Sequence, residues 1–124
     1  DQKNSLTVCL DNILRHAGIT RNTEYDLAQG KTAIQILEEN MTGVQVLDLS
    51  GCSLDAVLYY VNQDIPVLAI LEDGEAVLVT GFNEFNVVIM EPSTGKLYKK
   101  GMNDATTWFA ENGNHFISYM KIDN

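Results

Sequence analysis

The sequence has 124 residues, 45% of them hydrophobic, a size typical of one domain with a core of its own. Eight Lys and Arg against 17 Asp and Glu give a net charge of −9, which argues against nucleic acids and anionic membrane surfaces as partners, because clustered basic side chains bind both. No apolar run approaches the roughly 20 residues of a transmembrane helix, and residues 1–8 lack signal-peptide features, so we expect a soluble domain. The start at Asp1 without a Met suggests a processed chain or a domain excised from a larger protein.

The first predicted element is a helix over residues 6–17. Apolar side chains recur there at helical spacing, and Gly18 follows as a stop. Ser5 or Thr7 could supply the oxygen that caps the start of this helix. We therefore expect Cys9 to lie in the first turn, where unpaired backbone N–H groups favour a thiolate.

The next segment carries two further helix patterns and one strand. A second helix is predicted within residues 31–40, and the short apolar run 44–49 favours a strand. A third helix begins after Ser53, which we expect to cap it, and continues to residue 63.

From residue 66 onward, short apolar runs alternate with turn residues, a pattern that predicts antiparallel strands. The expected strands are 66–71, 76–82, 87–90 and 96–100, which form a four-stranded meander, and a closing strand at 115–122. A short helix around residues 105–112, capped by Asn103 or Asp104, precedes the last strand. Helices followed by strands predict a single α+β domain over residues 1–124, with N-terminal helices packed on a C-terminal antiparallel sheet.

Two stretches of this chain resemble a known enzyme family. Residues 9–19, CLDNILRHAGI, resemble the nucleophile helix of the papain-like cysteine peptidases that remove double-glycine leaders from bacteriocins, and of their wider bacterial relatives. Residues 63–71 and 74–97 are similar to the second half of that family, where a strand, a His-led strand, a Gly-aromatic turn and an Asp-Pro-x-x-Gly corner succeed one another. The resemblance implies a papain-like fold, in which a helix terminus helps to hold a cysteine thiolate.

The resemblance gives roles to four residues. The nucleophile falls on Cys9, and the glutamine of the oxyanion hole falls on Gln2, which also has the simpler interpretation of an exposed terminal residue. The catalytic histidine stands six positions before the glycine of the turn, and here that position is Glu75. The orienting aspartate is replaced by Glu91. A carboxylate cannot become the cation that stabilises a thiolate, so it should raise the pKa of a nearby thiol.

Neither histidine is an evident substitute for the missing base. His16 follows Cys9 by seven residues on the same predicted helix, which separates their Cα atoms by ~10.5 Å. His115 opens the last predicted strand, and the sequence does not place it near Cys9. Both main site residues also have a purely structural interpretation, Cys9 as a buried core residue and Glu75 as an exposed residue at a strand end.

Other chemistries have little support in the sequence. Cys9 and Cys52 show no spacing motif, so they predict neither a disulfide framework nor, with the two histidines, a zinc site. No glycine-rich phosphate loop is present. We therefore expect no cofactor and no metal.

Three hypotheses follow from this pattern. The first is a peptidase-like domain that has lost its catalytic base and serves as a binding or structural module, with an extended peptide or another protein domain as partner. The second is an active cysteine peptidase with Cys9 as nucleophile and a base supplied by His115 or a partner chain. The third is an unrelated α+β domain whose strands imitate the motif. The compartment stays open, and a larger secreted or cell-surface bacterial protein is one setting that fits.

Overall fold

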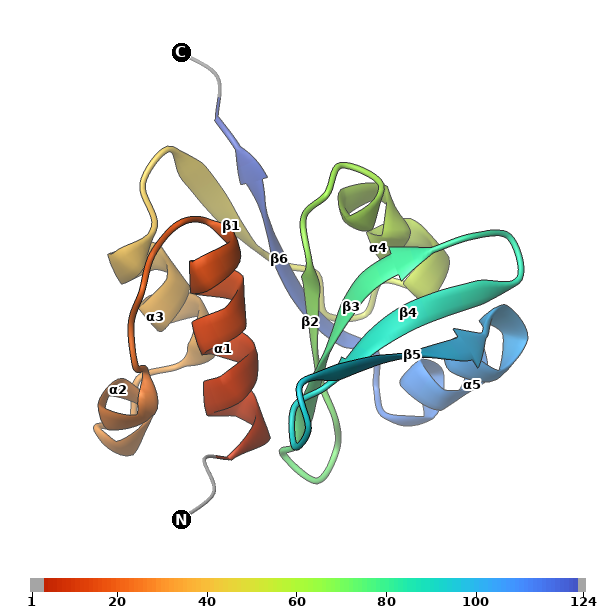
Figure 1. The fold of residues 1–124 in the computed structure, drawn as a ribbon, viewed down its shortest axis with the longest axis horizontal. Coiled ribbons are helices and arrows are strands. Elements are labelled where there is room, and N and C mark those ends of the chain that lie inside the picture. The colour runs from red at the N-terminus through yellow and green to blue at the C-terminus, as the bar shows by residue number, and fades with distance from the viewer. Residues whose placement is uncertain (1–3, 123–124) are drawn as a thin grey trace.

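A computed structural model describes residues 4–122, which form five helices and six strands (Figure 1). The elements are α1 (Ser5–His16), α2 (Glu24–Ala28), α3 (Ala33–Asn40), β1 (Val44–Asp48), α4 (Leu54–Val61), β2 (Val67–Ile70), β3 (Ala76–Phe82), β4 (Asn86–Glu91), β5 (Lys96–Gly101), α5 (Met102–Glu111) and β6 (His115–Lys121). Every predicted helix and strand is confirmed. The short helix α2 was not predicted.

All six strands belong to one antiparallel sheet with the order β1-β6-β2-β3-β4-β5. The predicted meander is therefore confirmed as β2 to β5. The last strand, β6, lies between β1 and β2, where Ile117 pairs with Leu68 and Tyr119 pairs with Val46. The C-terminal strand thus joins the early strand β1 to the meander.

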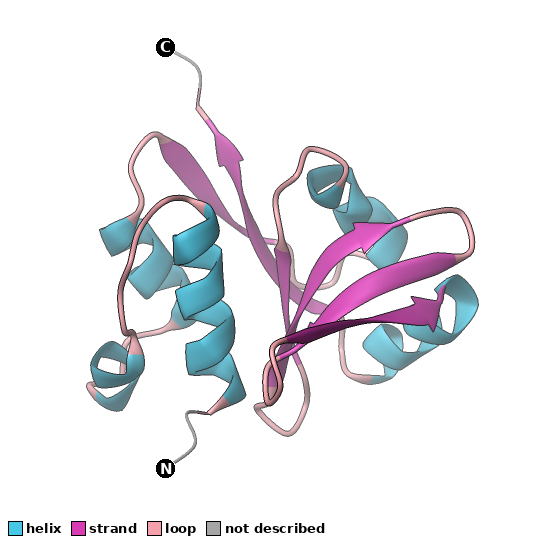
Figure 2. Cartoon of the chain, viewed as in Figure 1, coloured by secondary structure: helices cyan, strands magenta, loops and turns pink. Residues whose placement is uncertain are grey.

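Helices cover both faces of this sheet (Figure 2). Successive strand residues point to opposite faces, so Leu68 and Leu78 pack with α1 and α3, whereas Val67 and Val79 pack with α4 and α5. The result is two hydrophobic core clusters, one on each side of the sheet. The α+β class predicted from the order of elements is confirmed, and the use of both faces is a detail that this order did not specify.

Two helix starts differ from the prediction. Asn4 caps α1, because its side chain accepts a hydrogen bond from the Thr7 backbone N–H at 2.7 Å. Ser5 is therefore the first residue of the helix and Cys9 the fifth, so the expectation that Cys9 lies in the first turn is wrong. The backbone N–H of Cys9 is used within the helix and cannot favour a thiolate.

Helix α5 also begins earlier than predicted. Gly101 occupies the capping position and α5 starts at Met102, so Asn103 and Asp104 lie in its first turn. The predicted cap of α4 is confirmed, since the Ser53 side chain accepts a hydrogen bond from the backbone N–H of the third helical residue at 3.2 Å. Among residues 4–122, no helix has both the length and the apolar character needed to cross a membrane.

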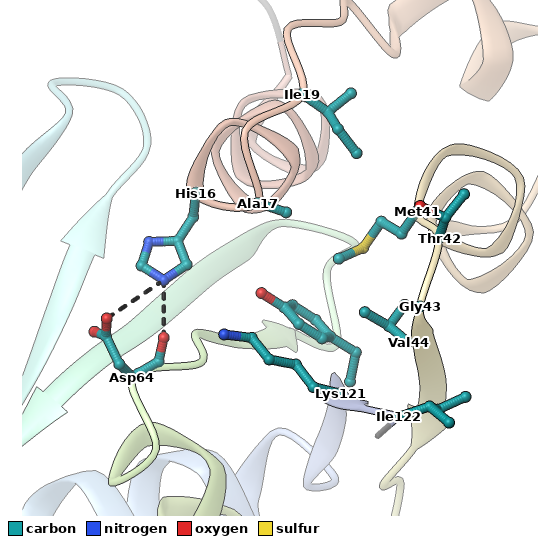
Figure 3. Close-up of a pocket in the computed structure, with 11 residues that line it drawn as sticks. His16, Ala17, Ile19, Met41, Thr42, Gly43, Val44, Asp64, Lys121 and Ile122 are labelled. Carbon is teal, nitrogen blue, oxygen red and sulfur yellow. Dashed lines mark hydrogen bonds and ion pairs between the residues drawn. The ribbon is translucent and has the colours of Figure 1, made fainter. Parts of the chain in front are cut away.

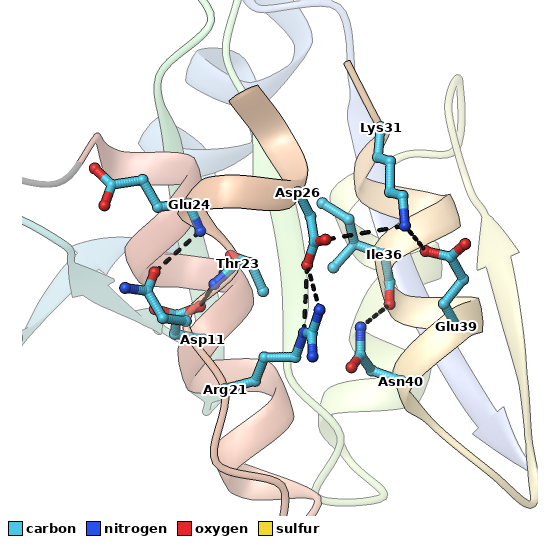
Figure 4. A network of polar contacts seen from close by, with 10 residues as sticks. Asp11, Arg21, Thr23, Glu24, Asp26, Lys31, Ile36, Glu39 and Asn40 are labelled. Atoms are coloured by element: carbon cyan, nitrogen blue, oxygen red, sulfur yellow. Dashed lines mark hydrogen bonds and ion pairs between the residues drawn. The ribbon is translucent and has the colours of Figure 1, made fainter. Parts of the chain in front are cut away.

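Polar contacts hold the connection between α1 and α3 in place (Figure 4). The Asp11 carboxylate, buried on α1, accepts hydrogen bonds from the backbone N–H and the hydroxyl of Thr23, both at 2.9 Å. Asp26 on α2 is 5% exposed and accepts a hydrogen bond from Arg21 Nη2 at 2.9 Å, while Lys31 Nζ lies 3.9 Å from its other oxygen. These contacts fasten α2 to both flanking segments.

Candidate functional site

The start of α1 meets the start of β3, and one side chain joins them. The Ser5 hydroxyl donates a hydrogen bond to Glu75 Oε2 at 3.1 Å and accepts one from the Ala76 backbone N–H at 2.8 Å. Two segments that are 70 residues apart in the sequence are thereby fastened together. The residue in the first turn of the N-terminal helix, facing Glu75, is therefore a serine.

Glu75 is positioned by the tight turn between β2 and β3. Its carbonyl accepts a hydrogen bond from the Leu71 N–H at 2.7 Å, and its own N–H donates to Asp73 Oδ1 at 2.9 Å. Gly74 supplies a positive φ of 86°, a conformation that L side chains rarely adopt. The side chain of Glu75 is exposed and reaches toward α1.

Glu91, at the end of β4, faces the same space as Glu75. Its Oε1 accepts a hydrogen bond from the Ser93 N–H at 2.9 Å, which shapes the turn after Pro92. Glu75, Glu91 and Ser5 line one cleft of about 520 Å³. The structure therefore brings together the two carboxylates that the resemblance places at the histidine and aspartate positions.

The groove continues past Glu91 toward α5. A second hollow of about 260 Å³ shares Ser5, Glu75 and Glu91 with the first cleft and extends to Tyr98 and Trp108. Burial, and then the charge of Glu91, raise the pKa of the Tyr98 hydroxyl. The groove thus carries carboxylates at one end and aromatic side chains at the other.

Cys9 is placed differently from the residues that line this cleft. Its side chain is 0% exposed and belongs to the core cluster between α1 and the sheet. Burial, together with a smaller contribution from the charge of Glu91, raises the pKa of the thiol to about 12. A carboxylate thus raises the pKa of this thiol, as expected. Burial is the larger cause, however, and the carboxylate is Glu91 rather than Glu75.

Neither histidine lines the cleft. His16 lies at the opposite end of α1, where its Nε2 is 2.8 Å from the Asp64 carbonyl oxygen. His115 opens β6, pairs with Ile70 in register and packs its ring against Gly113.

Gln2 falls outside the described residues. Ser5 is the site residue that the sequence reasoning did not select as a reacting position, although Asn4 is a residue type that caps helices as readily as serine does. Placing the cap at Asn4 would have put Ser5 in the first turn. Within the described part of the chain, no group of three or more His, Cys, Asp or Glu side chains is arranged to hold a metal ion.

Comparison with known proteins supports the fold. The structure is similar to the crystal structure of a "putative C39-like peptidase" from Bacillus anthracis, with a TM-score of 0.81 and 16% sequence identity over 99% of this chain and 91% of that one. No protein-family model matches the sequence, and no curated protein matches it. The likeness shows a papain-like α+β fold, which argues against an unrelated domain that only imitates the motif.

Proposed function

We propose that this chain is a peptidase-like domain without peptidase activity, which serves as a structural module or as a module that binds an extended peptide. The observation that carries this proposal is the Ser5–Glu75 hydrogen bond. The resemblance gave the nucleophile to Cys9, but Cys9 is buried beyond the first turn, so we assign the nucleophile position to Ser5 and the position of its base to Glu75. Both reacting groups of a cysteine–histidine pair are replaced by groups of different chemistry.

The bonding of Ser5 suits a clamp better than a nucleophile. One lone pair of its oxygen accepts the Ala76 N–H, and its proton is directed to a carboxylate. A serine hydroxyl needs a base that takes its proton as it attacks, and imidazole performs this task because its pKa lies near neutrality. A solvent-exposed carboxylate is ordinarily a much weaker base, so the pair holds α1 on β3 without activating the hydroxyl.

The burial of Cys9 supports this proposal over an active peptidase that uses Cys9. A substrate cannot reach a side chain that is 0% exposed, and a thiol with a pKa of about 12 stays protonated at neutral pH. The fold likeness is compatible with an active peptidase, and the burial of Cys9 is what favours the inactive domain.

Binding remains chemically reasonable at the same groove. Extended peptides bind through main-chain hydrogen bonds and small pockets for their side chains, and the groove beside Ser5 combines polar, carboxylate and aromatic groups. An inactive cleft would retain a peptide after binding it.

The experiment is a comparison of hydrolysis and binding in one set of variants. We expect the wild-type chain to leave a pool of extended hexapeptides uncut, and we expect their addition to shift the amide signals of Ser5, Glu75 and Ser93 in nitrogen-15 NMR spectra. If the wild type hydrolyses these peptides and Ser5→Ala does not, the proposal that the domain lacks peptidase activity is wrong. Absence of any shift at the cleft would overturn the binding role and leave the structural one.

A double substitution tests whether the geometry of the site survives. In the variant Ser5→Cys with Glu75→His, an imidazole faces a thiol, so we expect the pKa of the new thiol to fall below that in Ser5→Cys alone. The pH dependence of iodoacetamide labelling measures both values. Equal values would mean that residues 5 and 75 do not interact in solution.

A further inference from the structure

A second pocket lies at the opposite end of α1 from Ser5. It has a volume of about 650 Å³, within the range of small-molecule sites, and α1 separates it from the acidic cleft by about 18 Å. Four segments form its walls: the end of α1, the loop between α3 and β1, the turn before β2, and the end of β6 (Figure 3). The proposed peptide groove uses none of them.

Tyr119 on β6 gives the first indication of a ligand. Its side chain is 3% exposed and packs in the core, yet it lines this pocket. Its hydroxyl has no hydrogen-bond partner among residues 4–122. The hydroxyl is not one of the enclosed polar atoms that lack a partner, so it opens onto the pocket and is available to a ligand there.

Two opposite charges flank Tyr119. Lys121 lies two residues further along the same strand, and its side chain runs toward His16 and Asp64 (Figure 3). Within the described residues, Lys121 forms no ion pair. Asp64 supplies the negative charge from the turn before β2, and its carboxylate is largely exposed.

His16 holds Asp64 in this position. A carbonyl oxygen only accepts hydrogen bonds, so the 2.8 Å contact between His16 Nε2 and the Asp64 carbonyl means that Nε2 carries a proton and donates it. Asp64 has a φ of 63°, an uncommon conformation for a residue with a side chain. The histidine is thus a positioning residue that fastens the end of α1 to the turn before β2.

The rest of the pocket combines Thr42 with apolar side chains. Ile19 lies after α1, Met41 lies at the end of α3, and Val44 begins β1. A ligand would match this site if it carried three groups: a carboxylate facing Lys121 and the Tyr119 hydroxyl, an ammonium facing Asp64, and an apolar body against the apolar side chains.

We propose that this pocket binds a small zwitterion with an apolar body, the chemistry of a free apolar amino acid or of a short unblocked peptide. Its carboxylate contacts the Lys121 ammonium and the Tyr119 hydroxyl, its ammonium contacts the Asp64 carboxylate, and its side chain packs on Met41. This binding is independent of the function proposed for the groove beside Ser5.

Four probes test the chemistry by titration in nitrogen-15 NMR spectra: leucine, the dipeptide Leu-Leu, N-acetyl-leucine and leucinamide. We expect saturable shifts at residues 16–19, 41–44 and 119–122 with leucine or Leu-Leu at millimolar concentration. Each blocked compound should bind about tenfold more weakly than leucine, since it loses one charged hydrogen bond. Preference for leucine over Leu-Leu identifies the free amino acid as the ligand, and the reverse identifies the peptide.

Two variants with a matched control complete the test. Tyr119→Phe removes only a hydroxyl that has no partner in the protein, so we expect an unchanged melting temperature and several-fold weaker binding. Lys121→Met should weaken binding about tenfold, whereas Lys99→Met on β5 should leave it unchanged. The proposal is overturned if no probe gives saturable shifts, if blocked and unblocked compounds bind equally, or if both pocket variants bind like the wild type.

Discussion

Alkylation of Cys9 by iodoacetamide gives a quantitative test of whether this thiol can act as a nucleophile. Only the thiolate reacts, and its fraction follows from the pKa. With a pKa of about 12, roughly 10⁻⁴ of the thiol is ionised at about pH 8, compared with ~0.1 for a thiol at the ordinary value of 9.0. The native protein should therefore react at Cys9 at least about a thousandfold more slowly than the same protein unfolded in urea. Because the side chain is also 0% exposed, the reagent must wait for an opening of the structure, which makes this ratio a lower bound.

The assay follows each cysteine separately by mass spectrometry of proteolytic peptides after timed labelling. Cys52 is partly exposed and serves as an internal control for reagent activity, because it should be modified in the native protein. A Cys52→Ala variant confirms that the slow rate belongs to Cys9.

A native labelling rate at Cys9 within tenfold of the unfolded rate would refute this reasoning. It would mean that Cys9 is accessible and carries an appreciable thiolate fraction, as a nucleophile must. The hypothesis of an active peptidase centred on Cys9 would then regain its physical basis.

Three further predictions concern stability. Because the pKa of Cys9 is raised on folding, the protonated thiol contributes its full stabilisation below pH 9, and this is lost as the pH rises toward 12. At about pH 10.5, the free energy of unfolding measured by urea titration should therefore have fallen by ~2 kcal/mol more in the wild type than in Cys9→Ala. Asp26→Asn should lower the free energy of unfolding by ~1–3 kcal/mol, since a buried charged hydrogen bond is lost. The control is Glu38→Gln at an exposed position, and an equally small change in both variants would contradict the prediction. Ser5→Ala should cost ~1 kcal/mol and speed hydrogen exchange at the Ala76 amide, and unaltered exchange there would argue against the clamp.

The sequence predicted the elements of the fold well because each has a local cause. The strands of the meander are short apolar runs separated by turns such as EDG, and Ser53 caps α4 through a bond only three residues long. The position of β6 between β1 and β2 has no such local cause. It results from pairing between segments that are more than 40 residues apart, and the alternation of apolar residues within β6 is the same for any neighbour.

The start of α1 shows how a small local error changes the interpretation of a site. Asn4, Ser5 and Thr7 are all capping residue types, and apolar periodicity beginning at Leu6 does not choose among them. The choice depends on the extended backbone of Asn4, with φ −68° and ψ 159°, and on the bond that its side chain accepts. With the helix starting one turn before Cys9, the residue facing Glu75 becomes Ser5.

The pocket at the other end of α1 could not be predicted from the sequence at all. Its polar groups come from His16, Asp64, Tyr119 and Lys121, which are distributed over the whole chain without any spacing motif. The left-handed backbone of Asp64 and the depth of Tyr119 are properties of the assembled fold.

Under the function proposed above, the contact between α1 and β3 explains how a peptidase-like fold persists without peptidase chemistry. The family resemblance implies a catalytic pair on the first turn of α1 and the residue before β3, and any hydrogen bond across that junction also stabilises the packing of helix on sheet. Ser5 makes two such bonds, one to the Glu75 side chain and one to the Ala76 backbone. Because the Ala76 bond does not depend on the identity of residue 75, replacing a histidine there would remove the base while leaving half of the junction intact. Catalysis and stability are therefore separable at this position, and a substitution that abolishes the first need not damage the second.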